Sequence, residues 1–383
     1  MEILGVIAFV VALLLSVMVH EFGHYITARK FNFQVTEFFL GFGKRIWSYR
    51  RGETEFGVKA IPAGGYCKIS GMTPDDVMAP GQEPRAFYSA RSSKKLIVLG
   101  AGSFLHFVLG FFLLFTLLAG VGVNTITPVI KEVIPDSAAL DAGFRAGDEI
   151  TSIDGQVITD WATGFDLIRS SNGAQLRFTV ARDGQEVSLV ATPRLTDVGG
   201  EERYLLGIIN DIGTKRIDVI SAGKESALIS KNMIVESVKS LALLPAKIPE
   251  LWGQTFGGDE RDINGLVGVV GVARVSGENL ASGDQNWSQR IGTFLLIIAS
   301  LNIFVGIFNL LPILPLDGGH MAVALADEFR AFIARLRGRP RPAPINVRVL
   351  TPITAVVVVI LIALTLLLLV ADIINPISLN GYS

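Results

Sequence analysis

Four long apolar stretches constrain this chain more than any other feature of its sequence. They run from about Ile3 to Ile26, from Leu96 to Val121, from Ile291 to Leu314 and from Leu350 to Val370. Each is long enough to cross a bilayer as a helix, and within lipid only helices and closed barrels satisfy their own backbone hydrogen bonds. Half of the 383 residues are hydrophobic, as is typical of membrane proteins. The sequence therefore predicts four transmembrane helices.

Composition also excludes some classes of protein. The net charge is -1, so nothing in the overall charge suggests a nucleic-acid partner. Cys67 is the only cysteine, which excludes an intramolecular disulfide and a cysteine-based zinc cluster. The first apolar stretch lacks a basic leading segment and ends in charged residues, so we expect it not to be a cleavable signal peptide.

Basic residues predict how the helices are oriented, because lysine and arginine concentrate in cytoplasmic loops. They cluster after the first apolar stretch, just before the second, and between the last two: Arg29, Lys30, Lys44, Arg45, Arg50, Arg51, Arg91, Lys94, Lys95, Arg330, Arg335, Arg337, Arg339, Arg341 and Arg348. We therefore expect both of these loops to be cytoplasmic. Both termini and the long segment 124–289 are then extracytoplasmic.

The first apolar stretch ends in a pattern with the spacing of a metal site. His20 and His24 are four residues apart, so on a helix both imidazoles lie on one face and can bind one ion. Two histidines at this spacing suit Zn²⁺, and the intervening Glu21 suits a general base that activates water. Ionisable residues inside a membrane segment are costly and are functional candidates by default. A chance pattern, or a polar helix end at the headgroups, is the alternative.

The end of the third apolar stretch offers a third ligand. A catalytic zinc site with two histidines has a third protein ligand and an open fourth position. Asp317 is expected at the cytoplasmic end of this stretch, the same depth as His20 and His24, and a helix-capping aspartate is the alternative. Asn309 lies at membrane depth, where its amide can hold a substrate or donate to an oxyanion, unless it bonds another helix.

The loop between the first two apolar stretches has strand-like alternation. Residues 38–43 and 56–66 alternate in character and are interrupted by glycine, which predicts β-hairpins. Irregular backbone is tolerated at membrane depth only where it is buried in protein or lines a wet cavity. We expect hairpins associated with the membrane beside the metal site, and a hairpin on the cytoplasmic surface is the alternative.

The polar middle of the chain predicts a small domain of strands and helices. A strand at 129–133 precedes a helix, a turn and another strand, and a hairpin with an Asp154-Gly155 turn follows. A helix at 161–170 and a second hairpin at 176–192 complete the pattern. The run from Ala142-Gly143 to Gly147-Asp148-Glu149-Ile150 resembles the signature of a PDZ domain of the bacterial protease type. That resemblance implies peptide binding by strand addition, and a generic β domain is the alternative.

A further helix is predicted from about Ser226 to Leu244. Its apolar residues Ile234, Val238, Leu241 and Ala242 recur at helical spacing, and two prolines, Pro245 and Pro249, are expected to end it. This amphipathic helix is expected on the outer face of the membrane. Packing against the PDZ domain is the alternative.

Three features together resemble one protein family. They are the His20-Glu21-x-x-His24 motif in the first apolar stretch, the segment with Asn309-x-x-Pro312 and Leu316-Asp317-Gly318 at the end of the third, and the intervening PDZ domain. The chain resembles the site-2 proteases, which are intramembrane zinc metalloproteases, and among them the bacterial regulators of sigma-factor release with a single PDZ domain.

The resemblance implies a mechanism, a cofactor and a substrate. It implies His20, His24 and Asp317 as ligands of Zn²⁺, Glu21 as catalytic base and Asn309 as a substrate-positioning residue. The implied substrate is a single-pass membrane protein, such as an anti-sigma factor already trimmed outside, cut within the bilayer of the bacterial inner membrane. His106 stands where the family usually has asparagine, and Ser103 where it has proline, so His106 is left out of the zinc set with its role open.

The expected fold is an α-helical membrane protein with four transmembrane helices, membrane-associated β-hairpins and an extracytoplasmic α+β PDZ domain. The expected divisions are 1–124, 125–195 for the PDZ domain, 196–289 for a linker with the amphipathic helix, and 290–383. A PDZ domain that excludes untrimmed substrates is favoured over one that recruits trimmed ones. The oligomeric state is not predicted.

Two other functions are considered. A membrane scaffold with structural zinc would have four protein ligands, whereas three are well placed here. A metal transporter would have ligands on several helices and in repeats, and the sequence has no repeat.

Overall fold

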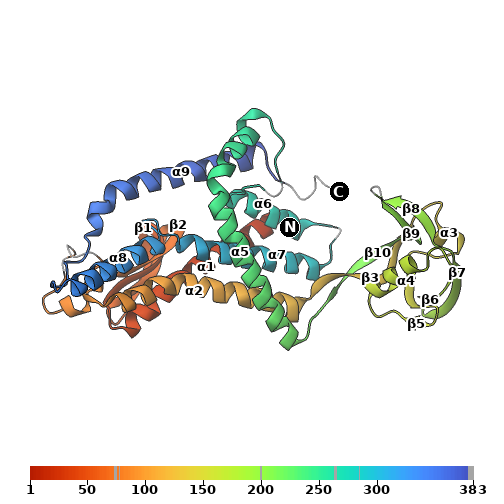
Figure 1. Cartoon of the computed structure of the whole chain (residues 1–383), viewed down its shortest axis with the longest axis horizontal. Coiled ribbons are helices and arrows are strands. Elements are labelled where there is room, and N and C mark those ends of the chain that lie inside the picture. The colour runs from red at the N-terminus through yellow and green to blue at the C-terminus, as the bar shows by residue number, and fades with distance from the viewer. Residues whose placement is uncertain (73–75, 77, 199–200, 263–264, 284, 378–383) are drawn as a thin grey trace. The chain divides into compact units, whose positions relative to one another are not determined.

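The computed structural model of the chain describes residues 1–72, 76, 78–198, 201–262, 265–283 and 285–377 (Figure 1). The chain forms two compact units. The first consists of Met1–Gly120 and Asp218–Ser383, and the second of Val121–Ile217.

Four helices of the first unit are long and apolar enough to cross a membrane, as predicted. They are α1 (Glu2–Lys30), α2 (Ser92–Phe115) with its π-helical extension η3 (Thr116–Val121), α7 (Trp287–Asn309), and α9 (Thr351–Ile374) preceded by η5 (Val347–Leu350). The third is shifted from its predicted range: it begins at Trp287 rather than near Ile291 and ends at Asn309 rather than near Leu314. Pro312 lies just beyond this end and lacks the backbone N–H that a further helical turn would use.

Glycines let α2 pack closely against both α1 and α7. A Cβ atom on Gly23 of α1 would lie 2.6 Å from the carbonyl oxygen of Ala101 on α2. A Cβ atom on Gly306 of α7 would lie 2.9 Å from the ring of Phe107 on α2. Small residues at helix interfaces allow this close approach in membranes. The helix interfaces that carry the polar residues described below are therefore tightly packed.

Helix α5 (Val219–Trp252) is longer than predicted. It continues through Pro245 and Pro249, the two prolines expected to end it. Leu251, beyond both prolines, is only 2% exposed and packs the last turn inward. The helix then passes into the π-helical turn η4 (Gly253–Gly257).

Helix α5 packs against two of the spanning helices. Its residues Ile234 and Leu241, with neighbouring apolar side chains, contact the core of α2 and α7 at Leu114 and Ile303, and Figure 1 shows α5 crossing both helices. Val238 is more than half exposed. These contacts of α5 therefore lie with the spanning helices of the same unit.

Helix α6 (Val269–Ala281) packs along α1, where Gly5 and Gly277 meet so closely that a Cβ atom on Gly5 would lie 2.8 Å from Gly277 Cα. In contrast, no residue in the most apolar window of the fourth span is buried. The C-terminal end of α9 is held by a buried ion pair between Asp372 and Arg261, 3.2 Å apart. Asp372 also accepts a hydrogen bond of 2.8 Å from the Gly271 backbone.

The loop after α1 forms an antiparallel sheet of β1 (Val35–Arg51) and β2 (Thr54–Ile69). Residues 37–40 of β1 pair on one side with 55–58 and on the other with 65–68, because β2 bends around them. Positive φ angles occur at Gly41 and Gly43, where β1 passes residue 40, and at Gly64 of β2. The strands predicted at 38–43 and 56–66 are thus present. Two short 3₁₀ turns, η1 (Glu83–Arg85) and η2 (Phe87–Ser89), lead to α2.

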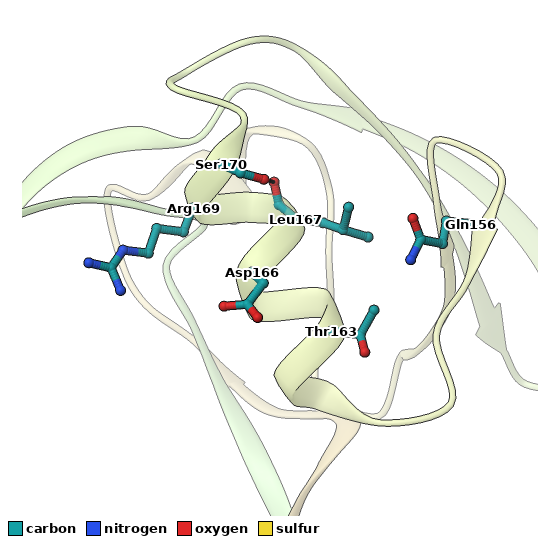
Figure 2. A pocket seen from close by; sticks show the side chains of 6 residues that line it. All are labelled: Gln156, Thr163, Asp166, Leu167, Arg169 and Ser170. Carbon is teal, nitrogen blue, oxygen red and sulfur yellow. Dashed lines mark hydrogen bonds between the residues drawn. The ribbon is translucent and has the colours of Figure 1, made fainter.

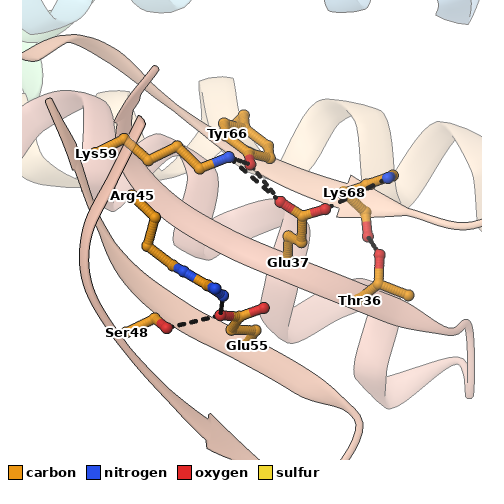
Figure 3. A network of polar contacts seen from close by, with 8 residues as sticks. All are labelled: Thr36, Glu37, Arg45, Ser48, Glu55, Lys59, Tyr66 and Lys68. Atoms are coloured by element: carbon orange, nitrogen blue, oxygen red, sulfur yellow. Dashed lines mark hydrogen bonds and ion pairs between the residues drawn. The ribbon is translucent and has the colours of Figure 1, made fainter. Parts of the chain in front are cut away.

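A network of ion pairs and hydrogen bonds joins residues 65–68, at the edge of this sheet, to residues 37–40 of β1 (Figure 3). Tyr66 donates a hydrogen bond to Glu37 and accepts one from Lys59, and Lys68 lies 3.4 Å from the other oxygen of Glu37. The hydrogen bond from Tyr66, with the nearby lysines, keeps the pKa of Glu37 below its ordinary value against the effect of burial. The network joins 65–68, the edge strand, to β1.

The second unit contains a sheet of strand order β10-β3-β4-β6-β7, with β5 beside β4 and a separate β8–β9 hairpin. Its elements are β3 (Val123–Val133), α3 (Ala138–Asp141), β4 (Glu149–Ile153), β5 (Gln156–Val157), α4 (Trp161–Ser170), β6 (Leu176–Arg182), β7 (Gln185–Ala191), β8 (Arg194–Val198), β9 (Glu201–Leu205) and β10 (Ile208–Lys215). The strands and helices predicted between 129 and 192 are present. Asp154-Gly155 and Asp183-Gly184 have the positive φ angles of tight hairpin turns.

The core of this unit is apolar, with Ile150, Phe178 and Val180 fully buried around Trp161. At its edge the buried carboxylate of Asp148 accepts hydrogen bonds from Arg182 at 2.7 Å and from the Arg145 backbone at 2.9 Å. This aspartate belongs to the predicted PDZ signature, and its contacts explain why the signature needs an acid there.

Candidate metal centre

The two histidines of α1 face the same point in space. His20 and His24 lie one helical turn apart, and each is 7% exposed. Their Nε2 atoms are 3.1 Å apart, close to the separation of two nitrogens that share an ion with bonds of about 2.0–2.1 Å. The helical spacing thus produces the arrangement expected from the sequence.

Asp317 reaches the same point from the other end of the chain. It is the first residue of α8 (Asp317–Leu336), and the loop before it turns back so tightly that a Cβ atom on Gly318 would lie 2.2 Å from the carbonyl oxygen of Leu310. Only glycine fits at position 318. The Oδ2 atom of Asp317 lies 3.1 Å from His20 Nε2 and 3.2 Å from His24 Nε2.

These three atoms fit a zinc ion. They lie within 4.8 Å of one another, and two imidazole nitrogens with one carboxylate oxygen are a donor set that Zn²⁺ prefers. Asp317 Oδ2 is buried and makes no aligned hydrogen bond despite its two close neighbours, as expected of an atom whose lone pair is directed at an ion. Burial acts to raise the pKa of Asp317, but its contacts with both histidines outweigh burial and keep the pKa below its ordinary value.

Helix α2 contacts the rings of both histidines. His24 Nδ1 lies 2.8 Å from the carbonyl oxygen of Val98; a carbonyl only accepts, so Nδ1 carries the hydrogen and Nε2 is free to bind a metal. One turn further, Gly102 makes room for His20, because a Cβ atom there would lie 2.5 Å from its ring. One turn further again, the ring of His106 lies 5.0 Å from that of His20 between centroids.

Asn302 of α7 could not be identified as part of this site from the sequence. This residue is 1% exposed, and its Oδ1 lies 2.8 Å from Nδ1 of His106. Its only sequence signal is an isolated amide in an apolar stretch, and its partner is 196 residues away. His106 itself is not among the three residues that meet at the metal position.

Glu21 lies between α1 and the edge strand of the β1–β2 sheet. A Cβ atom on Gly65 would lie 3.4 Å from Glu21 Cγ and 3.0 Å from Met18 Sδ, so the missing side chain lets the strand approach the helix. Within the described part of the chain, residues 65–68 pair with β1 on one side alone. A strand edge therefore lies next to Glu21.

Asn309 and His320 flank the site along the chain. Asn309 is the last residue of α7, is half-buried, and makes no side-chain hydrogen bond to the residues that the structure describes. His320 lies three residues after Asp317 on α8, where burial lowers its pKa. It is outside the metal group.

A pocket of about 590 Å³ lies in the second unit and not at the metal centre. Figure 2 shows it along α4, lined by Gln156, Thr163, Asp166, Leu167, Arg169 and Ser170. Its lining is mostly polar and shares no residue with the metal group.

Comparison with known proteins gives a consistent result. The model of peptidase family M50 matches residues 8–362. The chain is 34% identical to the zinc metalloprotease Rip1 of Mycobacterium tuberculosis over 99% of both chains. It is 34% identical to the zinc metalloprotease Rip1 of Mycolicibacterium smegmatis over 98% of both. Among solved structures, the PDZ domain of the SdrC-like protein of Listeria monocytogenes matches at 23% identity, covering 22% of this chain and 86% of that one, with a TM-score of 0.20.

Proposed function

The chain belongs to peptidase family M50 and is a multi-pass zinc metalloprotease of the site-2 type, and we propose that it cuts single-pass transmembrane proteins within the bilayer. The observation that carries this proposal is the convergence of His20, His24 and Asp317 at the end of an apolar helix. Three protein donors leave a fourth position open, which favours a catalytic site over a structural one.

Each residue has a defined part in the proposed reaction. His20, His24 and Asp317 hold the zinc, which when bound polarises a carbonyl and lowers the pKa of water to about 7. Glu21 takes the proton of the attacking water and returns it to the leaving amine, because it lies between the two histidines on α1 yet is outside the metal group. Asn309, with no partner among the described residues, offers its amide to the substrate backbone.

The β1–β2 sheet supports a way to present the scissile bond. A transmembrane helix hides its peptide bonds in internal hydrogen bonds, so it must unwind before attack. The open edge of residues 65–68, beside Glu21, can pair with the unwound segment as an added strand. In this proposal the sheet lies at membrane depth, and residues 65–68 line the wet site.

The proposed orientation places the loops with α8 and the β1–β2 sheet in the cytoplasm and the second unit outside, in a bacterial inner membrane. This orientation rests on the arginines and lysines of both loops. The substrate class is then a membrane protein whose outer domain has been trimmed, such as an anti-sigma factor. The second unit, as a PDZ domain, excludes substrates that still carry a large outer domain.

The direct test uses the purified full-length protein in lipid with candidate single-pass substrates. Zinc-loaded protein should cut the substrate within its membrane segment, chelation should stop the reaction, and added zinc should restore it. Cleavage confined to soluble peptides, with intact membrane segments left uncut, would contradict the intramembrane proposal.

A further inference from the structure

A second buried polar cluster lies directly beside His20. It joins three spanning helices through Ser16 of α1, His106 of α2 and Asn302 of α7, which are 4%, 2% and 1% exposed. Polar groups between apolar helices are costly unless their hydrogen bonds are made. The proposed catalytic roles use none of the three.

The hydrogen bonds of this cluster have a defined direction. The Asn302 amide nitrogen donates to the Ile298 carbonyl at 2.8 Å and to the Ser16 hydroxyl at 3.1 Å, and that hydroxyl donates onward to the Ala12 carbonyl at 2.9 Å. The amide orientation is therefore fixed, since a carbonyl only accepts. Asn302 Oδ1 then accepts from His106 Nδ1. His106 carries its hydrogen on Nδ1 and has a bare lone pair on Nε2.

His20 needs a hydrogen-bond acceptor, whereas His106 Nε2 offers one. When its Nε2 faces a metal, its hydrogen is on Nδ1, and a metal-bound histidine almost always donates that hydrogen to an acceptor. His20 Nδ1 is buried and has no hydrogen-bond partner in the described structure. The adjacent ring, with centroids 5.0 Å apart, belongs to His106 and offers a bare Nε2.

We propose that His106 and Asn302 are positioning residues of the metal centre. Asn302 holds His106 in the Nδ1–H form, and His106 Nε2 accepts the hydrogen of His20 Nδ1 once the metal is bound. Each metal-binding histidine then has its own acceptor on one face of α2: Val98 for His24 and His106 for His20. The inference rests on the proposed function only in requiring that the centre binds zinc.

Zinc affinity of the full-length protein, measured by chelator competition without substrate, tests the inference. His106→Phe keeps an aromatic ring without nitrogens, and Asn302→Leu removes the amide that orients it. Each should weaken zinc binding by about 10–100-fold, the usual effect of losing such a partner. His106→Gln, whose amide oxygen can accept from His20, should recover part of the loss.

Asn279→Ala is the matched control, because Asn279 is fully buried, donates to the Arg290 carbonyl at 2.8 Å and lies outside this cluster. It should bind zinc as the unaltered protein does. Unchanged zinc affinity in His106→Phe, or an equal loss in Asn279→Ala, would overturn the inference. Because no substrate is used, a failure of peptide cleavage would count against the proposed function and not against this result.

Nitrogen NMR of zinc-loaded protein labelled with ¹⁵N-histidine reports which ring nitrogen of each histidine carries a hydrogen. A merely structural role of His106 would not change this signal in the other histidines. The chain has only four histidines, and spectra of His106→Phe and His320→Ala assign two of them. His106 should show a hydrogen on Nδ1 and a metal-free Nε2, and Asn302→Leu should shift the Nδ1 signal of one of the two remaining histidines. A hydrogen or a metal on His106 Nε2 would overturn the inference.

Discussion

His24 donates its Nδ1 hydrogen to the carbonyl oxygen of Val98 across the interface between α1 and α2, over 2.8 Å. This bond directs the other ring nitrogen, Nε2, toward Asp317, 3.2 Å away. The candidate metal centre therefore depends on three helices that are far apart in the chain. The histidine spacing places both rings on one face of α1, and α2 orients them.

Asp317 and Asn309 should separate zinc binding from substrate binding. Asp317→Ala should lower zinc content and activity together, because it removes one of three donors. Asn309→Ala should lower activity with zinc retained. Metal analysis and cleavage assays on the same samples check this, with His320→Ala as a control that keeps its zinc. Full zinc occupancy in Asp317→Ala would show that the third ligand lies elsewhere.

The orientation can be tested with single cysteines in a Cys67→Ser background. Arg339 and Asp183 are both exposed, so a cysteine at either position is open to a membrane-impermeant maleimide. In intact inner-membrane vesicles of known orientation, Arg339→Cys should react from the cytoplasmic side and Asp183→Cys from the outer side. The reverse pattern would place the metal centre near the outer face.

Removal of the second unit should widen the range of substrates. The structure indicates where to cut: residues Val121–Ile217 form one compact unit, so a short flexible linker from Gly120 to Asp218 removes the unit without leaving unpaired strands. The shortened enzyme should cut untrimmed substrate and still cut trimmed substrate. If it binds zinc but fails on trimmed substrate, the unit recruits substrates rather than excluding them.

The buried Arg261–Asp372 pair should matter for stability. Breaking one partner of a buried pair leaves an uncompensated charge and costs about 3–5 kcal/mol, so Asp372→Ala should lower the unfolding temperature in detergent. The double variant Arg261→Met with Asp372→Leu should lose less. Glu236→Ala, in an exposed pair with Lys239, should change stability by about 0–1 kcal/mol. Equal unfolding temperatures in Asp372→Ala and Glu236→Ala would contradict this role.

The elements that the sequence predicted well are those with a strong local pattern. The spanning helices follow from long apolar stretches, and the hairpin at Asp183-Gly184 follows from a turn that needs positive φ angles. The course of α5 did not follow, because the effect of Pro245 and Pro249 depends on what the flanking turns pack against. Helix propensity alone gives no information about that packing.

The candidate site likewise contains residues that a local sequence pattern reveals and residues that only the tertiary structure reveals. The meeting of His20, His24 and Asp317 could be predicted from the sequence because ionisable side chains stand out in apolar surroundings. Val98 could not be found, since it acts through a backbone carbonyl that every residue has. Asn302 gave only a weak signal, and its pairing with His106 is a tertiary contact.

The central claim is that this site hydrolyses peptide bonds and that Glu21 is the catalytic base, not a metal ligand. The most direct measurement is zinc content and substrate cleavage in one preparation of Glu21→Gln. The account predicts zinc content equal to that of the unaltered protein and cleavage reduced by about 10²–10⁴-fold or more. Normal cleavage by Glu21→Gln would contradict it.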